Sequence, residues 1–369
     1  MKPEWSCLKD VKIIDASQLL PGPHATSLLL QLGADVIKVE RRGSGDTSRE
    51  LGNAIFAQFN RDKRSVALNL DDSADRQAFL DLVRDCDAVV EGFRPGVMKN
   101  LGLGYDDLVK VNPAIVMCSI SGFGQTGPYS AHAGHDLNYL AMAGYWAAPT
   151  QVESKVARPG VRVSDYAASS YAALSLVVAI MSARQSGAGQ HLDVSIHDSI
   201  LSWTAPSAWL AKSFEKNPVM SPMVMPENDI FETRDGRYIV LGILENKFWT
   251  TLCDCLGEAF PQLNDPRFST RIGRLACKKE VNQLLKQIFL SKTLAKWSQY
   301  LADVDLPFSS VLRASELFCD THVRARGTLR EFAEEAAIAV RFPVKFSLGL
   351  PDTEGKVPAL GEFTSTTTK

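Results

Sequence analysis

Short apolar runs alternate with amphipathic segments through the first third of the chain. Runs with the length and composition of buried strands are found at residues 11–17, 34–40, 65–70, 88–93 and 114–121. Segments with helical periodicity follow several of them, at residues 24–33, 73–86 and 96–104. Strands that alternate with helices are typical of βαβ units, in which helices cover a parallel sheet. We therefore predict an α/β fold for this part of the chain.

The pattern changes after residue 200. Before it we expect helices at 136–144 and 165–185 and a strand at 189–196, and the segment 217–228, with its prolines and methionines, indicates a linker. Apolar runs on either side of Asp235-Gly236 predict a hairpin at 229–243, and helices are expected at 247–256, 278–290 and 294–301. The predicted domains are a large α/β domain at 1–200, a linker at 201–228 and a smaller α+β domain at 229–329, with 330–369 rejoining the large domain.

Composition and charge narrow the classes of partner. The 369 residues include 40 Lys and Arg against 42 Asp and Glu, a formal net charge of −2, and 45% of them are hydrophobic. This is the composition of folded globular proteins, so it excludes a disordered or fibrous chain. Because there is no basic excess, we expect neither nucleic acid nor a membrane as a partner.

The cysteines and the first residues indicate a compartment. Seven cysteines, an odd number, lie mostly in apolar runs, as reduced thiols of cytosolic proteins do. Cys253 and Cys255 are spaced like half of a metal site, but no second pair of ligands accompanies them, so no bound metal is expected. The first ten residues lack the apolar core of an export signal. We therefore expect a cytoplasmic protein.

One glycine-rich loop has the spacing of a dinucleotide-binding motif. Gly122, Gly124 and Gly127 form a G-x-G-x-x-G pattern directly after a predicted strand. Pro128 follows, however, no apolar helix begins there, and no acidic residue ends a strand about twenty residues on, where a ribose contact would need it. The pattern favours a glycine loop that a ligand approaches closely over a site for NAD.

Basic side chains stand beside several predicted strands. Arg41 and Arg94 follow the strands at 34–40 and 88–93, and Lys63 precedes the strand at 65–70. Ligands of parallel sheets gather at the carboxyl ends of the strands, where arginines suit phosphate oxygens. Solvated loop charge is the alternative for each position taken alone.

Four acidic or imidazole side chains are candidates for chemistry. His135 and Asp136 precede an apolar helix, and Asp165 and Glu245 each stand at the start of a predicted helix. Each could simply cap its helix or form an ordinary buried hydrogen bond. Taken singly, none of them establishes a catalytic site.

Six segments taken together carry a resemblance: Leu20–Pro23, Ala34–Glu40, Asn60–Ser65, Phe93–Val97, Ser121–Gln125 and Gly134–Tyr139. In order and spacing they resemble motifs of the family III CoA-transferases of the CaiB/BaiF type, a family that includes α-methylacyl-CoA racemase. The resemblance runs from the first predicted strand to about Phe363. It implies a Rossmann-like large domain, a small domain and an interlocked homodimer that takes an acyl-CoA substrate.

The resemblance also implies residues that contact CoA. Arg41, Lys63 and Arg94 would hold its phosphates and adenosine, and the loop from Ser121 and Gly122 to Gly124 would border the pantetheine. Asp136 and Tyr139, from the last of the six segments, are also expected to contact CoA. CoA enters as part of the thioester substrate, and no permanently bound cofactor is expected.

Two chemistries are open within this family. The counterpart of Asp165 in the transferases is a nucleophile that passes through mixed-anhydride and thioester intermediates. The racemase branch instead has counterparts of His135, Asp165 and Glu245. Inverting a carbon beside a thioester needs one proton carrier on each face, roles that His135 and Asp165 can alternate while Glu245 orients the imidazole.

We predict the racemase branch, a 2-methylacyl-CoA racemase or epimerase that acts through an enolate. The alternative is a CoA-transferase that moves CoA between carboxylic acids with Asp165 as nucleophile. A third hypothesis, from a different class, is a protein that binds CoA esters without turnover.

Overall fold

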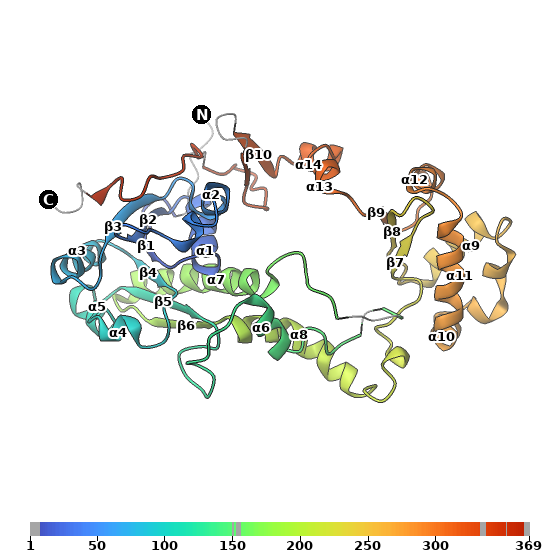
Figure 1. Ribbon diagram of the computed structural model, residues 1–369, viewed down its shortest axis with the longest axis horizontal. Coiled ribbons are helices and arrows are strands. Elements are labelled where there is room, and N and C mark those ends of the chain that lie inside the picture. The colour runs from blue at the N-terminus through green and yellow to red at the C-terminus, as the bar shows by residue number, and fades with distance from the viewer. Residues whose placement is uncertain (1–7, 150, 153–155, 333–336, 352, 365–369) are drawn as a thin grey trace. The chain divides into compact units, whose positions relative to one another are not determined.

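The computed structural model describes residues 8–149, 151–152, 156–332, 337–351 and 353–364. The chain divides into two compact units (Figure 1). The first unit comprises Met1–Ala143, Pro159–Trp203 and Thr321–Lys369, and the second comprises Gly144–Arg158 and Thr204–Asp320. Each unit has its own hydrophobic core and is described by itself.

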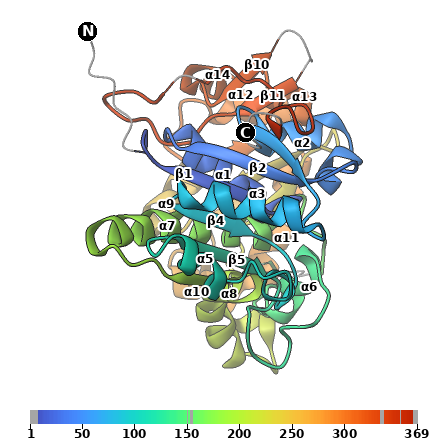
Figure 2. The same cartoon turned by 90° about the vertical axis from the view of Figure 1, so that its left-hand side faces the viewer.

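A parallel sheet of six strands forms the centre of the first unit (Figure 2). Its strands are β1 (Lys12–Ala16), β2 (Asp35–Arg41), β3 (Arg64–Leu68), β4 (Ala88–Glu91), β5 (Val116–Ser121) and β6 (His191–Ser195). The order across the sheet is β3-β2-β1-β4-β5-β6. This is the Rossmann order, in which the chain reverses direction across the sheet between β1 and β4. All six strands fall within the segments that the sequence pattern assigned to strands or within one residue of them.

The alternation of side chains along the strands builds two cores. Ile13 of β1 packs with residues of α1 (Pro21–Gln31) and α7 (Val163–Ser186), whereas Ile14 points to the other face, toward α3 (Ser73–Arg84) and α5 (Tyr105–Val111). Successive side chains of a strand point to opposite faces, so both faces of these strands are buried. Helices on both faces confirm the predicted α/β class.

Shorter elements complete the first unit: η1 (Thr47–Arg49), α2 (Asn53–Asn60), α4 (Val97–Asn100), α6 (Asp136–Met142), α14 (Thr321–Arg326), β10 (Leu329–Phe332) and β11 (Ala337–Val340). The last described residues lie against β3. The Phe363 N–H donates to the Ser65 carbonyl at 2.9 Å, and the Thr364 hydroxyl accepts from the Ala67 N–H at 2.9 Å. Residues almost 300 positions apart are thereby joined in one unit.

The second unit packs helices against a small antiparallel sheet. Its strands β7 (Ile230–Glu232), β8 (Tyr238–Leu241) and β9 (Phe308–Ser310) pair in that order, with the predicted turn at Asp235-Gly236. Its other elements are η2 (Pro218–Met220), α9 (Asn246–Leu256), η3 (Pro261–Asn264), η4 (Pro266–Phe268), α10 (Arg271–Ala276), α11 (Lys278–Leu290), α12 (Leu294–Leu301) and α13 (Ala314–Leu317). The predicted hairpin and three predicted helices are confirmed.

Two long helices differ in how well the sequence predicted them. α8 (Ile196–Lys212) was not predicted, and it occupies the first part of the segment predicted as a linker at 201–228. α7 was predicted and is long and apolar enough, by length and composition alone, to cross a membrane. Half of its most apolar window is buried within the protein, and it packs against α1 and β5. This is how the core helix of a folded domain behaves.

Candidate functional site

A pocket of about 490 Å³ opens at the carboxyl ends of the central strands of the first unit. Its walls include Ser17–Gly22 after β1, Gly92–Pro95 after β4 and Ile120–Gly122 at the end of β5. In open parallel sheets the loops of neighbouring strands separate where the strand order reverses, and the crevice they leave binds ligands. The position of the pocket therefore follows from the sheet topology.

Six of the site residues predicted from the sequence line this pocket: Arg94, Ser121, Gly122, His135, Tyr139 and Asp165. They come from the loop after β4, the end of β5, the start of α6 and the start of α7. Arg162, which sequence reasoning did not single out, lies on the pocket wall three residues before Asp165. Arg162 lies one helical turn before Asp165, a spacing that makes side chains neighbours, and this spacing could have identified it from the sequence.

Asp165 lies in the first turn of α7, and only 7% of it is exposed. Burial, and after it the nearby negative charge of Asp136, raise the pKa of its carboxyl from 3.8 to about 7 against the opposing positive charge of Arg162. A carboxylate that is poorly solvated is a stronger base and nucleophile than one in water. Asp165 can therefore give or take a proton, or attack a carbonyl carbon, near neutral pH.

Asp136 is also buried, its charge acts on the Asp165 carboxyl, and it is not among the described residues that line the pocket. Its carboxylate accepts the backbone N–H of Ser164 at 2.9 Å and the Ser164 hydroxyl at 2.7 Å. These bonds fix the start of α7 and use an N–H group that could otherwise have faced an oxyanion. In this structure Asp136 supports Asp165, and its predicted contact with CoA is untested.

His135 precedes α6 as its N-cap residue and is exposed on the pocket wall. Its backbone N–H donates to the Asn138 side chain at 3.0 Å. Tyr139, on the same helix, donates its hydroxyl to the Gly134 carbonyl at 2.6 Å, and burial and the charge of Asp165 raise the pKa of this phenol to about 12. The imidazole and the Asp165 carboxyl thus lie on the walls of one pocket.

Gly122 lets the end of β5 pass directly over Tyr139. A Cβ atom at position 122 would lie 2.5 Å from the Tyr139 Oη, closer than real Cβ atoms come to other atoms. The glycine predicted to allow close approach of a ligand is therefore required first by the packing of the protein itself. The resulting loop leaves Ser121 and Gly122 on the pocket wall.

The remaining predicted residues lie outside this pocket. Arg41 lines an adjoining pocket of about 230 Å³ that shares Ser17, Gln18 and Phe93 with the first. Glu245 is exposed in the second unit, at the start of α9, where its side chain makes no capping hydrogen bond. Its predicted role beside the His135 imidazole stays a prediction.

Lys63 lies away from solvent, with 2% of its surface exposed. Its ammonium, with three N–H donors, lies within hydrogen-bond distance, 2.8–2.9 Å, of oxygen atoms of four residues: Asp15, Pro23, Thr26 and Asn60. Burial lowers the pKa of this ammonium to about 8. A direct contact with a CoA phosphate would require the ammonium to leave these partners, so Lys63 is a structural cation in this structure.

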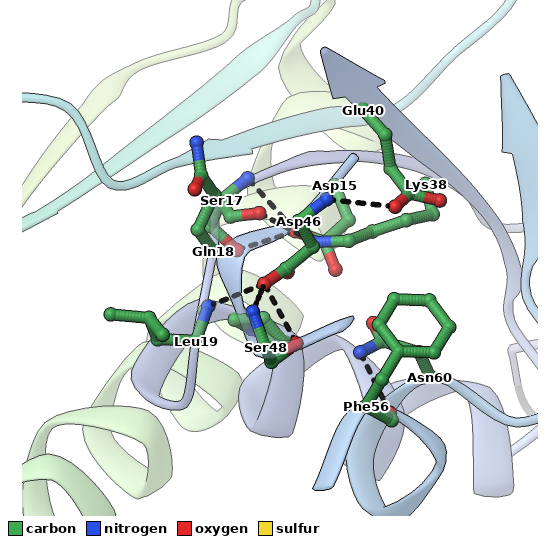
Figure 3. Close-up of polar contacts among 12 residues, drawn as sticks. Asp15, Ser17, Gln18, Leu19, Lys38, Glu40, Asp46, Ser48, Phe56 and Asn60 are labelled. Carbon is green, nitrogen blue, oxygen red and sulfur yellow. Dashed lines mark hydrogen bonds and ion pairs between the residues drawn. The ribbon is translucent and has the colours of Figure 1, made fainter. Parts of the chain in front are cut away.

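A second buried cation shapes the pocket rim (Figure 3). The Lys38 ammonium lies 2.9 Å from the Asp46 carboxylate, and both side chains are completely buried. The other oxygen of Asp46 accepts the backbone N–H of Leu19 at 3.1 Å and two hydrogen bonds from Ser48. Leu19 has a φ of +64°, a conformation that costs a non-glycine residue free energy, and it lines the pocket. The buried pair therefore holds a strained residue in the pocket wall.

Among the described residues no group of three His, Cys, Asp or Glu side chains is arranged to hold a metal ion. The pocket wall carries a buried carboxyl, two exposed imidazoles (His132 and His135), two guanidinium groups and polar backbone at strand ends. Such a set can bind anions, transfer protons and form covalent bonds to carbonyl carbon.

Comparison with known proteins agrees with the geometry. The model of the family described as CoA-transferase family III matches residues 8–364. The chain belongs to CoA-transferase family III. The predicted family is thereby confirmed.

Similar proteins in the family were found by sequence and by structure. An acyl-CoA transferase from Fusarium pseudograminearum is 34% identical over 97% of this chain and 83% of its own length. The succinyl-CoA:glutarate CoA-transferase of Mus musculus is 30% identical over 99% of this chain and 85% of its own. A crystal structure of a hypothetical protein from Mycobacterium tuberculosis covers 98% of this chain and 99% of its own, with a TM-score of 0.86 and 27% identity. Both named relatives are transferases, and neither is named a racemase.

Proposed function

We propose that this protein is a CoA-transferase that moves coenzyme A between carboxylic acids, with Asp165 as its covalent nucleophile. The observation that carries the proposal is the buried Asp165 carboxyl on the wall of the strand-end pocket. The names of the family III relatives support this chemistry over the racemase reaction predicted from the sequence.

The proposed reaction modifies the Asp165 carboxylate covalently and regenerates it at the end. One of its oxygens attacks the thioester carbonyl carbon of the donor, the C–S bond breaks, and CoA leaves as a thiolate. The thiolate attacks the Asp165 carbonyl carbon of the mixed anhydride, which releases the donor acid and leaves CoA as a thioester of Asp165. The acceptor carboxylate displaces that thiolate, and the thiolate then attacks the acceptor carbonyl, giving acceptor-CoA and free Asp165.

The surroundings of Asp165 suit this role. Burial deprives the carboxylate of solvation and the negative charge of Asp136 repels it, and both effects strengthen it as a nucleophile. The nearby guanidinium of Arg162 favours the ionised form that must attack. Ser164, held by Asp136, fixes the first turn of the helix that carries the nucleophile.

CoA would extend from this pocket into the adjoining one. Arg94 lines the first pocket and Arg41 the second, and the two share the loop residues Ser17 and Gln18. Guanidinium groups suit phosphate oxygens, and the Ser121–Gly122 strand end would border the pantetheine. Lys63 is left out of this proposal because its ammonium already has four protein partners.

Racemisation remains a second candidate because of one observation. His135 and Asp165 line the same pocket, as two proton carriers that flank one α-carbon must. In that reaction Glu245 would orient the imidazole. The two candidates differ in what happens at Asp165: a transferase acylates it, whereas a racemase only moves its proton.

A homodimer is part of the proposal. Tyr171, Leu174, Val178 and Met181 are 38–62% exposed and recur every three or four residues along α7. This spacing places them on one face of the helix, an apolar stripe of the kind that a second subunit covers. We expect Leu174→Glu to lower the molar mass measured by light scattering, while the matched change Leu312→Glu, at an exposed leucine outside the stripe, leaves it unchanged. A cytoplasmic location stays a prediction.

The deciding experiment follows the fate of Asp165. The protein is incubated with succinyl-CoA or acetyl-CoA and hydroxylamine, which captures acylated carboxyl groups, and Asp165 is then examined by peptide mass spectrometry. A hydroxamate at Asp165, absent from the Asp165→Asn variant, is the expected result. In parallel, one enantiomer of a 2-methylacyl-CoA is incubated in deuterated water. Exchange of the α-proton without any trapped Asp165, lost in His135→Ala, would refute the transferase and establish the racemase.

A further inference from the structure

We propose that Arg162 binds the second carboxylate of a dicarboxylic acid, which makes this protein selective for dicarboxylate over monocarboxylate substrates. The proposal rests on the transferase function proposed above, since it concerns which acids enter the Asp165 pocket. It adds a specificity-determining residue to that site.

The charged groups on the pocket wall are unbalanced. Arg94 and Arg162 both line the pocket, and among the described residues of its wall Asp165 is the only acidic one. No described carboxylate lies within 4 Å of either guanidinium as an ion pair, although ion pairs of this kind form elsewhere in the first unit, as between Arg49 and Glu40. Arg162 itself is exposed. The pocket therefore presents an exposed guanidinium that pairs with no carboxylate among the described residues and is open to an anionic ligand.

The position of Arg162 in the sequence assigns it to the reacting end of the pocket. It is the N-cap residue of α7, and the nucleophile Asp165 follows within the first turn of the same helix. Its charge acts on the Asp165 carboxyl. The phosphates of CoA lie at the far end of a long pantetheine arm, which we assign to the adjoining pocket with Arg41. A ligand group that meets Arg162 is therefore part of the acyl group or the acceptor acid.

A free carboxylate fits this place chemically. A guanidinium presents parallel N–H donors that match the two oxygens of a carboxylate, a pairing stronger and more directional than that of a neutral donor. An acid that is held at one end by Arg162 turns its other carboxylate toward the Asp165 thioester, so the pairing also orients the reacting group. A monocarboxylate of the same length would bring a methyl group against the guanidinium and gain neither effect.

The test compares acids of equal length. Transfer from acetyl-CoA is measured to succinate and butyrate, and to glutarate and valerate, and the ratio of kcat/KM for the dicarboxylate over the monocarboxylate is taken for each variant. In Arg162→Met we expect this ratio to fall roughly 10–100-fold, the usual value of a charge-assisted hydrogen bond. Arg162→Lys should retain part of the preference. Arg84→Met, at an exposed arginine on α3, is the matched control and should retain all of it.

The outcomes separate this inference from the proposed function. An unchanged ratio in Arg162→Met, or a wild-type protein that transfers CoA to monocarboxylates as readily as to dicarboxylates, overturns the role of Arg162 and leaves the transferase standing. Absence of transfer to every acid, without trapping of Asp165, refutes the transferase itself. If Arg162→Met turns over too slowly for rates, calorimetric titration with succinate and butyrate makes the same comparison through binding.

Discussion

Replacing Asp165 by asparagine should abolish transfer and at the same time stabilise the folded protein at alkaline pH. Burial and the negative charge of Asp136 raise the pKa of the Asp165 carboxyl from 3.8 to about 7. The folded protein thus binds this proton more tightly than the unfolded chain does. Each pH unit of difference corresponds to about 1.4 kcal/mol, so the ionised form costs the fold roughly 4 kcal/mol above pH 7.

The sign of the pH dependence follows from the same comparison. Below pH 3.8 the carboxyl is protonated in both states and carries no penalty. As pH rises from 3.8 to about 7 the unfolded chain loses the proton first, so the stability of the wild type falls, and above pH 7 the penalty is complete. Asparagine does not titrate. The gain in stability of Asp165→Asn should therefore be small at pH 4.5 and reach about 2–4 kcal/mol at pH 8, since relaxation of the site reduces the full value.

The assay is thermal or urea unfolding of the two proteins at pH 4.5, 6 and 8, together with transfer activity. Other titrating groups, such as Glu91, whose pKa burial also raises to about 7, are common to both proteins and cancel in the difference. Asp303→Asn, at an exposed aspartate, is the matched control and should show no pH-dependent gain. A gain for Asp165→Asn that is equal at all three pH values, or a loss of stability at pH 8, would refute the reasoning.

Three further predictions concern the pH dependence of transfer, the packing of Gly122 and the buried Lys38–Asp46 pair. Initial rates of transfer at saturating substrate should rise as pH increases through about 7 and then level off, because the Asp165 nucleophile must be ionised, and a fall over this interval would contradict its role. Gly122→Ala should destabilise the protein by about 1–3 kcal/mol in urea unfolding, because its Cβ would overlap the Tyr139 hydroxyl, and adding Tyr139→Leu should recover part of the loss. Asp46→Ala should cost about 3 kcal/mol because it removes a carboxylate partner of the buried Lys38, and an unchanged urea midpoint would show that Lys38 does not need this partner.

The strands β1 to β5 could be predicted because both of their faces are largely buried. Such strands appear in the sequence as continuous apolar runs between turns, a local signal that needs no knowledge of the partner strand. The helix α8 gave no such signal. Pro206 lies inside it and is read as a helix breaker from sequence, although the surrounding protein accommodates it.

The sequence predicts several side chains that line the candidate site, but not the hydrogen bonds that hold the site in place. Arg94, His135 and Asp165 could be singled out because they are polar groups at the ends of apolar segments. The role of Asp136 could not be, because its partner Ser164 lies 28 residues away and the two meet only in the folded chain. Lys63 illustrates the same limit: beside a strand it resembles an exposed phosphate ligand, and only the fold encloses it among protein oxygens.

The electrostatics of Asp165 alone do not choose between transfer and racemisation, since a carboxyl with a pKa of about 7 serves equally as nucleophile and as proton carrier. The role proposed for Arg162 does distinguish them. A 2-methylacyl chain is apolar and gains nothing from an exposed guanidinium, whereas a carboxylic acid gains a charged partner. With the role proposed for Arg162, the second substrate is an acid, and an acid that approaches an acylated Asp165 is the acceptor of a CoA-transferase.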